Sequence, residues 1–309
     1  MEWKGVMPAI TTCFDLNLRV DLSFLAGHCS WLVENGCTGI VPLGSLGEGA
    51  TLTPDEKLAI VKTCVKAVGS RVPVVAAVSS LSTREAVDLA RAFADAGCRG
   101  LMVLPPYVYL GDWRETKAHL AAVFQATSLP CMLYNNPVAY GIDFFPEQIQ
   151  ELAREHQNLA AVKESSTDVR RVTAIRALLG DRLAVLVGVD DAIVEGVAVG
   201  AVGWIAGLAN PLPRESVALF DLALRGESEK AMRLYRWFLP LLRMDTVPKF
   251  VQLIKLVQQE AGMGSARVRP PRLELAGEEL HGTQALIRRV LANRPADCRT
   301  PARQVTYAR

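Results

Sequence analysis

The sequence lacks the features that mark membrane, secreted and metal-binding proteins. No apolar run in its 309 residues reaches the roughly 18 residues that a membrane-spanning helix requires. The N-terminus leads directly into an apolar segment and has none of the regions of a signal peptide. Its four histidines form no H-E-x-x-H pair, so we expect no metal site.

The sequence also has no large excess of one charge sign and no closely spaced cysteine pair. The 34 Lys and Arg residues nearly balance the 32 Asp and Glu residues, so the net charge is +2, and no strong field favours nucleic acid or an anionic membrane. Seven cysteines lie at irregular spacing without a C-x-x-C pair, which is typical of reduced thiols. We therefore expect a cytoplasmic protein that binds neither nucleic acid nor membrane.

Eight short apolar segments, each followed by a helical pattern, are present instead. They span residues 6–12, 38–43, 72–78, 100–104, 130–134, 159–163, 183–188 and 201–206. Strands that alternate with helices predict parallel β-α-β units, and continuous apolar strands are buried on both faces. Eight units favour a (β/α)8 TIM barrel of the α/β class over a doubly wound sheet, which has fewer units and often a G-x-G-x-x-G motif.

The pattern changes after Gly226. Residues 1–225 are predicted to form the barrel, and residues 226–293 a C-terminal helical extension in which Pro240 and Pro248 break a long helical stretch. Residues 294–309 contain four arginines and little apolar content, and we expect them to form a mobile tail.

Two residues at the ends of neighbouring predicted strands suggest catalysis. Lys163 ends an apolar strand, and burial favours the neutral amine, which can attack a ketone and form a Schiff base. Tyr134 ends the preceding strand, so its phenol can meet the lysine and carry protons. The alternatives are a lysine whose amine reaches water and a packed tyrosine with a satisfied hydroxyl.

The remaining strand ends supply the predicted substrate site, because barrel enzymes place their chemistry there. The glycine-rich loop at Ser45 could form a nest of N–H groups for a carboxylate, or only a tight turn. We expect Glu48 and Glu164 to cap helices or pair with cations, and Asp190 and Asp191 to start a helix. The predicted substrate-binding residues are Gly44, Ser45, Leu46, Asn136, Gly188 and Ile205, with no metal or cofactor besides the covalent Schiff base at Lys163.

The sequence resembles the dihydrodipicolinate synthase/N-acetylneuraminate lyase family over nearly its whole length. The motifs are G-S-L-G-E at 44–48, Y-N-N-P at 134–137, V-K-E-S-S at 162–166 and G-W-I-A-G at 203–207. The resemblance implies a (β/α)8 barrel with C-terminal helices, usually a homotetramer, in which Lys163 forms a Schiff base with a small-molecule 2-keto acid. It also implies that Tyr134 relays protons and that Ser45 with the Leu46 N–H holds the carboxylate.

Departures from the synthase pattern bear on the substrate. Dihydrodipicolinate synthases have two threonines where this chain has Ser45 and Leu46. They lend a second tyrosine to the neighbouring subunit, where this chain has Val108, with Tyr109 as a possible substitute. They also have an arginine shortly after Y-N-x-P, whereas residues 138–140 read V-A-Y. The missing arginine argues against a substrate with a distal carboxylate.

One subgroup of the family matches three runs more fully. Y-N-N-P-V-A-Y-G-I-D at 134–143, K-E-S-S-T-D-V-R-R at 163–171 and G-V-D-D at 188–191 resemble 1-pyrroline-4-hydroxy-2-carboxylate deaminases. This likeness implies a deaminase of hydroxyproline catabolism that combines lyase and hydrolase chemistry and releases ammonia and 2,5-dioxopentanoate. The alternative is a synthase-like aldolase or dehydratase, a lyase acting on pyruvate or a 2-keto-3-deoxy sugar acid. A third hypothesis is a non-catalytic barrel that binds a keto acid.

Overall fold

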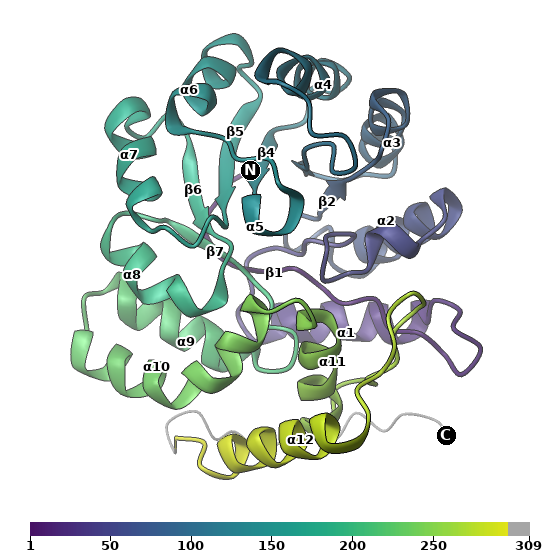
Figure 1. Cartoon of the computed structure of the whole chain (residues 1–309), viewed down its shortest axis with the longest axis vertical. Coiled ribbons are helices and arrows are strands. Elements are labelled where there is room, and N and C mark those ends of the chain that lie inside the picture. Colours follow the sequence, from purple (N-terminus) through teal and green to yellow (C-terminus); the bar gives the residue numbers. More distant parts are fainter. Residues whose placement is uncertain (296–309) are drawn as a thin grey trace.

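The computed structural model describes residues 1–295, in which parallel strands are surrounded by helices (Figure 1). The strands are β1 (Gly5–Pro8), β2 (Val75–Val78), β3 (Gly100–Val103), β4 (Cys131–Asn135), β5 (Leu159–Glu164), β6 (Ala184–Val187) and β7 (Gly203–Ala206). The helices outside the C-terminal part are α1 (Leu22–Glu34), α2 (Pro54–Val68), α3 (Thr83–Asp95), α4 (Trp113–Gln125), α5 (Pro137–Tyr140), α6 (Pro146–Glu155), α7 (Arg170–Leu179), α8 (Ile193–Ala198) and α9 (Pro213–Leu224). Two 3-10 helices lie among them, η1 (Gly49–Thr51) and η2 (Asp190–Ala192).

The sheet curls into the predicted (β/α)8 barrel. Its order is β1-β7-β6-β5-β4-β3-β2, and all of these pairs are parallel. The predicted second strand lies between β1 and β2 and is joined to them by isolated bridges, Ala9 to Val41 and Ile40 to Val74. It is not a regular strand, because the neighbouring Pro42 and Pro73 have no N–H to extend the ladders. The fold class is thus confirmed, with one barrel position reduced to bridges.

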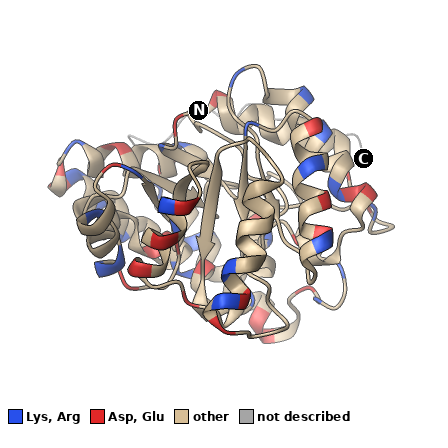
Figure 2. Ribbon diagram, turned by 90° about the horizontal axis from the view of Figure 1, so that it is seen from above, with Lys and Arg blue, Asp and Glu red and all other residues tan. Residues whose placement is uncertain are grey.

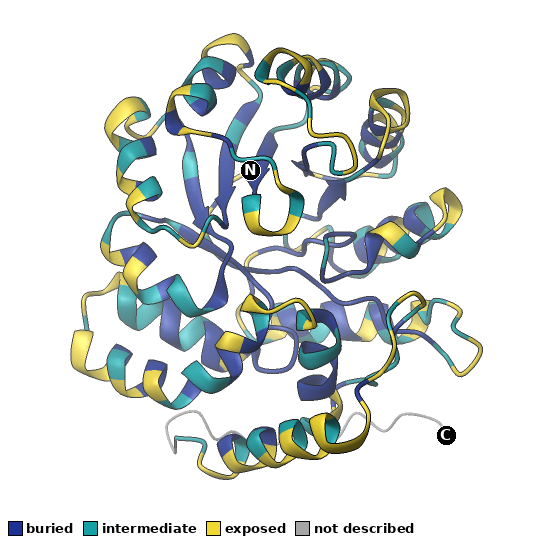
Figure 3. Ribbon diagram, viewed as in Figure 1, coloured by how far each residue is buried: buried dark blue, intermediate teal, exposed yellow. Residues whose placement is uncertain are grey.

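The strands form the centre of the core. Almost every strand residue is buried, and the exposed residues lie on the outer sides of the helices (Figure 3). Charges of both signs are spread over the helices that surround the strands (Figure 2). Among residues 1–295, no helix combines the length and the apolar character needed to cross a bilayer.

Local sequence signals set where several helices start. Thr53 caps α2 and Asp112 caps α4, and in both cases a glutamate three residues later returns the hydrogen bond. Such reciprocal caps satisfy N–H groups that the first helical turn leaves free. Both signals are visible in the sequence, as T-P-D-E at 53–56 and D-W-R-E at 112–115.

The C-terminal part adds α10 (Ser228–Leu242), the 3-10 helix η3 (Arg243–Thr246), α11 (Phe250–Glu260) and α12 (Gly277–Ala292). The expected break at Pro240 is wrong: Pro240 lies inside α10, two residues before its end, where a proline removes a single helical hydrogen bond. Pro248 does lie between two helices. The segment from η3 to α11 passes over one end of the barrel (Figure 1). The predicted tail falls outside the described residues from position 296 onward.

Candidate functional site

Lys163 and Tyr134 lie side by side on paired strands. They are register partners on β5 and β4, as the sequence predicts, and they are 6% and 3% exposed. The Lys163 Nζ lies 3.9 Å from the centroid of the Tyr134 ring. The amine is therefore largely buried and packs on the face of the Tyr134 ring. This contact leaves the amine available to a reactant in the cavity.

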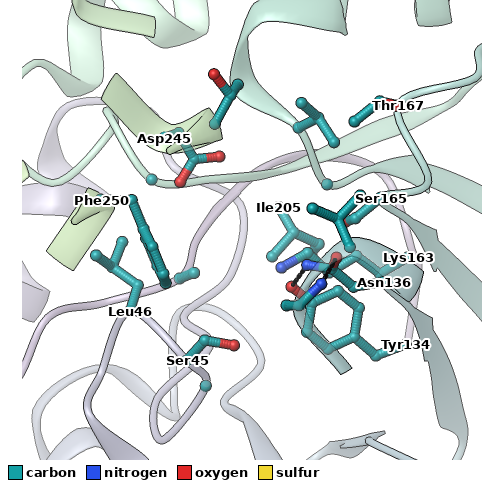
Figure 4. A pocket seen from close by; sticks show the side chains of 18 of the residues that line it. Ser45, Leu46, Tyr134, Asn136, Lys163, Ser165, Thr167, Ile205, Asp245 and Phe250 are labelled. Carbon is teal, nitrogen blue, oxygen red and sulfur yellow. Dashed lines mark hydrogen bonds between the residues drawn. The ribbon is translucent and has the colours of Figure 1, made fainter. Parts of the chain in front are cut away.

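The Tyr134 hydroxyl is oriented by a neighbour. Asn136 donates from Nδ2 to the Tyr134 hydroxyl oxygen at 3.0 Å, and its own Oδ1 accepts from the Ala139 N–H at the start of α5 (Figure 4). A hydroxyl that accepts in this way is free to donate its own proton into the cavity. The Y-N-N-P motif thus supplies both the phenol and the amide that positions it.

Gly188 makes room for the lysine. A Cβ at this position would lie 2.5 Å from Lys163 Cε and would also collide with Ser165 Oγ. A side chain on Gly188 would therefore displace the Lys163 stem. The Ser165 hydroxyl is buried beside it without a hydrogen-bond partner among the described residues, so it is free to bind a ligand.

The glycine-rich loop supplies Ser45 to the opposite wall. The Ser45 hydroxyl is hydrogen-bonded to the hydroxyl of Tyr140, whose ring meets that of Tyr134 edge-on at 5.8 Å. Burial raises the pKa of Tyr140, and the nearby Tyr134 raises it further. Tyr140 is therefore a neutral hydroxyl group that links Ser45 to the Y-N-N-P segment.

All eight predicted site residues line one cavity of about 400 Å³: Gly44, Ser45, Leu46, Tyr134, Asn136, Lys163, Gly188 and Ile205. The structure brings these residues together, and their roles in binding and catalysis remain predictions. Among the described residues that line this cavity, Lys163 is the single cationic side chain. A substrate with a second, distal carboxylate would therefore find no positive partner there.

Glu48 pairs with a cation, as expected, whereas Glu164, within the described residues, neither caps a helix nor forms an ion pair but accepts hydrogen bonds from neutral groups. Glu48 is fully buried, and its Oε1 accepts from Lys255 Nζ at 2.5 Å. Glu164 accepts from Asn135 Nδ2 at 3.1 Å and from the Ser166 N–H at 2.6 Å. Neither carboxylate lines the cavity.

The 3-10 helix η2 begins at Asp190, as predicted, but the predicted capping role of the Asp190 side chain is wrong. Its side chain caps no helix N-terminus but accepts from Trp204 Nε1 at 2.9 Å and from the N–H groups of Gly207 and Leu208 at 3.0 and 2.7 Å. Trp204 lies within β7, and Gly207 and Leu208 directly follow that strand. Asp190 therefore ties β6 to β7, a tertiary contact that helix-capping rules cannot anticipate.

Sequence reasoning missed the residues that cover the cavity. Asp245, Thr246, Val247, Pro248 and Phe250 line it from the segment between η3 and α11. Asp245 is half-buried, and burial together with the neighbouring Asp190 raises the pKa of its carboxyl well above the usual range. No motif marks this aspartate, since the helical pattern does not reveal which end of the barrel the extension reaches.

The described part of the chain contains no group of three or more His, Cys, Asp or Glu side chains that could hold a metal ion. The groups that line the cavity include an amine, a phenol, two serine hydroxyls and a carboxyl. This set can carry out Schiff-base formation and proton transfer.

Comparison with known proteins agrees with this chemistry. Residues 2–290 match the model of the Dihydrodipicolinate synthetase family. A relative from Agrobacterium fabrum (strain C58), named 4-hydroxy-tetrahydrodipicolinate synthase, is 34% identical over 269 residues, which cover 87% of this chain and 92% of the relative.

Solved structures of similar proteins share the fold over most of the chain. A dihydrodipicolinate synthase from Bacillus anthracis aligns with a TM-score of 0.89 at 28% identity and covers 93% of this chain and 98% of that one. A prophage protein of the same family from E. coli K12, in complex with pyruvate, aligns with a TM-score of 0.85 at 26% identity and covers 94% and 99%. The expectation of a hydrolase is wrong, because the matched family and the named relative are lyases.

Proposed function

The chain belongs to the Dihydrodipicolinate synthetase family, whose members are class I lyases that act through a Schiff base, and we propose that Lys163 forms this Schiff base with pyruvate or a 2-keto-3-deoxy sugar acid. The observation that carries the proposal is the buried Lys163 amine, 3.9 Å from the Tyr134 ring centroid, at the wall of the cavity. The names of the relatives support an aldolase or dehydratase, and the pyruvate complex of the E. coli protein supports a keto acid as the ligand.

The residues support a defined sequence of steps. The neutral Lys163 amine adds to C2 of the keto acid, and the carbonyl oxygen takes up protons and leaves as water. Tyr134 is placed to carry these protons, because its hydroxyl is oriented by Asn136. Loss of a proton from C3 then gives an enamine. In an aldol condensation this enamine adds to an aldehyde, and in a dehydration it expels a hydroxyl from C4. In the reverse aldol reaction the enamine arises instead from cleavage of the C3–C4 bond.

The carboxylate of the substrate is proposed to bind on the glycine-loop side. Ser45 can donate from its hydroxyl and Leu46 from its N–H, and both residues line the cavity opposite Lys163 (Figure 4). Gly44, Gly188 and Ile205 shape the walls around the reacting carbons. Because no second cation lines the cavity among the described residues, the rest of the substrate is proposed to be hydroxylated rather than anionic.

Deamination of 1-pyrroline-4-hydroxy-2-carboxylate is a second candidate. This substrate has one carboxylate and no distal anion, so it suits a cavity in which Lys163 is the one cation among the described lining residues. Addition of Lys163 to C2 of the ring would release the ring nitrogen as an amine, and the same enamine would then expel the C4 hydroxyl. The two candidates thus share the Schiff base and differ in the product.

A substrate panel separates the candidates. Pyruvate with several aldehydes, several 2-keto-3-deoxy sugar acids and freshly generated 1-pyrroline-4-hydroxy-2-carboxylate would each be followed for condensation, pyruvate release, water loss and ammonia release. The proposed lyase activity predicts turnover of a keto acid with water loss or pyruvate release. Ammonia release as the fastest reaction would favour the deaminase, and no turnover of any substrate would contradict both.

A homotetramer in the cytoplasm is the further expectation from the family resemblance. Val108, Tyr109 and Leu110 are 73%, 62% and 61% exposed, and such a cluster supports a contact with another subunit. The six cysteines of the described residues are all buried and free, which supports a reducing compartment.

A further inference from the structure

Asp245 faces Lys163 across the cavity, although the two come from different layers of the fold. Asp245 lies in η3, in the segment that passes over the barrel end, whereas Lys163 lies on β5. Both line the same cavity, and Asp245 points into it from the side opposite Tyr134 and Ser45 (Figure 4). A substrate bound to Lys163 would therefore lie between the phenol of Tyr134 and the carboxyl of Asp245.

The two neighbouring aspartates differ in how many hydrogen bonds they accept. Asp190 receives three N–H donors on its two oxygens, from Trp204, Gly207 and Leu208, and such donors stabilise a carboxylate anion. Asp245 receives a single donor, the Asp190 N–H, on Oδ2 at 3.3 Å. Two neighbouring carboxylates do not ionise equally, so the one with fewer hydrogen-bond donors, Asp245, binds a proton more readily.

The charged groups around Asp245 also raise the pKa of its carboxyl, with the exception of Lys163. Burial raises the pKa of Asp245 most strongly, Asp190 raises it further, and Asp191 adds a smaller effect of the same sign. The Lys163 amine lowers it. Arg243 lies 3.8 Å from Asp191 and partly neutralises that charge. The Asp245 carboxyl, whose pKa burial and Asp190 raise, is therefore the member of the aspartate pair that is more readily protonated.

Gly207 allows Asp245 to occupy this position. A Cβ on Gly207 would lie 2.9 Å from Asp245 Oδ1 and 3.2 Å from Asp190 Oδ2, so a side chain would displace the carboxyl groups. Within the described residues, Asp245 Oδ1 has no hydrogen-bond partner. One oxygen of the acid is thus held by the backbone of Asp190, and the other is available to a ligand.

We propose that Asp245 is the general acid that protonates the C4 hydroxyl of the bound substrate as it leaves as water. This inference rests on the proposed Schiff base at Lys163 and adds a requirement for a hydroxyl at C4 of the 2-keto acid. Asp245 is thereby a catalytic residue that also determines specificity.

The elimination balances without any further reactant. The enamine arises when C3 loses its proton to the Tyr134 side of the cavity. Its electron pair then forms the C3–C4 double bond as the C4–O bond breaks. The Asp245 proton joins the departing hydroxyl, so water leaves and a carboxylate remains. The C2–nitrogen bond returns to an iminium, and the carboxylate takes up a proton from solvent before the next turnover. No oxidation or reduction occurs.

The test compares two leaving groups in the Asp245→Asn variant. Asparagine keeps an oxygen that accepts the Asp190 N–H but has no acidic proton. Elimination of water from a 4-hydroxy-2-keto acid should slow by about 10²–10⁴-fold, the usual contribution of a general acid. Elimination of fluoride from the 4-fluoro analogue should slow by less than about tenfold, because fluoride leaves without prior protonation. Borohydride trapping of pyruvate should be unchanged.

Asp191→Asn is the matched control, since this aspartate lies in the same segment as Asp190 but does not line the cavity. It should retain both eliminations. The inference is overturned if Asp245→Asn eliminates water within about threefold of the wild-type rate, well below a general-acid effect, or if both leaving groups slow equally. It is also overturned if the wild type traps pyruvate but eliminates water from no 4-hydroxy-2-keto acid, in which case the Schiff-base proposal still stands. Failure of the wild type to trap pyruvate would instead contradict the proposed function.

Discussion

Lys255 and Glu48 form a fully buried ion pair that joins α11 to the glycine-rich loop. Lys255 Nζ lies 2.5 Å from Glu48 Oε1, and the side chains are 1% and 0% exposed. Lys255 also donates to the carbonyl oxygen of Arg267, and Glu48 accepts from the Arg269 N–H. Glu48 has a left-handed backbone conformation with φ of 54°. The pair therefore holds a strained loop, three residues after Ser45, against the C-terminal part.

Breaking this pair should destabilise the protein. Lys255→Met leaves the Glu48 carboxylate buried without its main partner, and such a change costs about 3–5 kcal/mol of the free energy of unfolding. The double variant Glu48→Gln/Lys255→Met should lose less than the sum of the single variants, because no unpaired charge remains buried. Urea unfolding of the four proteins measures this coupling. Additive losses would show that the pair does not act as a unit.

Lys163 should be the residue that borohydride labels. Reduction in the presence of pyruvate should leave a permanent adduct on the peptide that contains Lys163, detected by mass spectrometry. Lys163→Arg should abolish both labelling and turnover, because arginine stays protonated and cannot act as the nucleophile.

Lys57 provides a matched control for this experiment. It is also buried, at 8% exposed, and burial lowers the pKa of its amine. It does not line the cavity. Lys57→Arg should therefore keep full labelling. An adduct on Lys57, or activity retained in Lys163→Arg, would mean that Lys163 is only a strand-end lysine.

Tyr134→Phe should separate binding from proton transfer. The variant keeps the ring that packs on the Lys163 amine but loses the hydroxyl that Asn136 orients. We expect turnover to fall by about 10²–10⁴-fold, as is usual for loss of a proton carrier, while the slow borohydride adduct still forms. Steady-state kinetics and labelling on the same preparation test this. Unchanged turnover would show that Tyr134 has a packing role alone.

The placement of Lys163 and Tyr134 could be predicted from the sequence, because consecutive parallel strands lie next to each other and present their ends at one face of the barrel. Asp245 could not be predicted. It comes from a helical segment whose pattern shows that the segment packs but not where. The side-chain role of Asp190 could not be predicted for a related reason: its oxygens accept from Trp204, Gly207 and Leu208, which only the closed barrel brings close to it.

Association of subunits should depend on the segment around Leu110. If this exposed apolar segment forms the subunit contact, Leu110→Lys should shift the protein from a tetramer towards smaller species, because an unpaired charge would be desolvated in the contact. Leu16→Lys is the control, since Leu16 is 82% exposed in a different loop. Sedimentation velocity at micromolar concentration reports the outcome. A wild-type monomer would contradict the tetramer, and a tetrameric Leu110→Lys would place the contact elsewhere.

The stability of the protein should fall in mild acid because of His28. This histidine is 3% exposed, its Nε2 lies 3.2 Å from Asn210 Oδ1, and burial lowers its pKa to about 4. The unfolded chain binds a proton to histidine below a pKa of about 6.5, whereas the folded protein does not until about pH 4. The contribution of His28 to the free energy of unfolding is therefore complete above about pH 6.5. It is lost at about 1.4 kcal/mol per pH unit as the pH falls from about 6.5 to about 4.

The variant His28→Gln isolates this effect, because glutamine can donate to Asn210 and does not titrate. The free energy of unfolding of both proteins would be measured in urea between pH 7 and pH 4.5. Carboxylates titrate alike in the two proteins and cancel in the difference. We expect the wild type to lose roughly 2–3 kcal/mol more than His28→Gln over this range. Parallel pH curves would show that His28 takes up its proton in the folded protein as readily as in the unfolded chain.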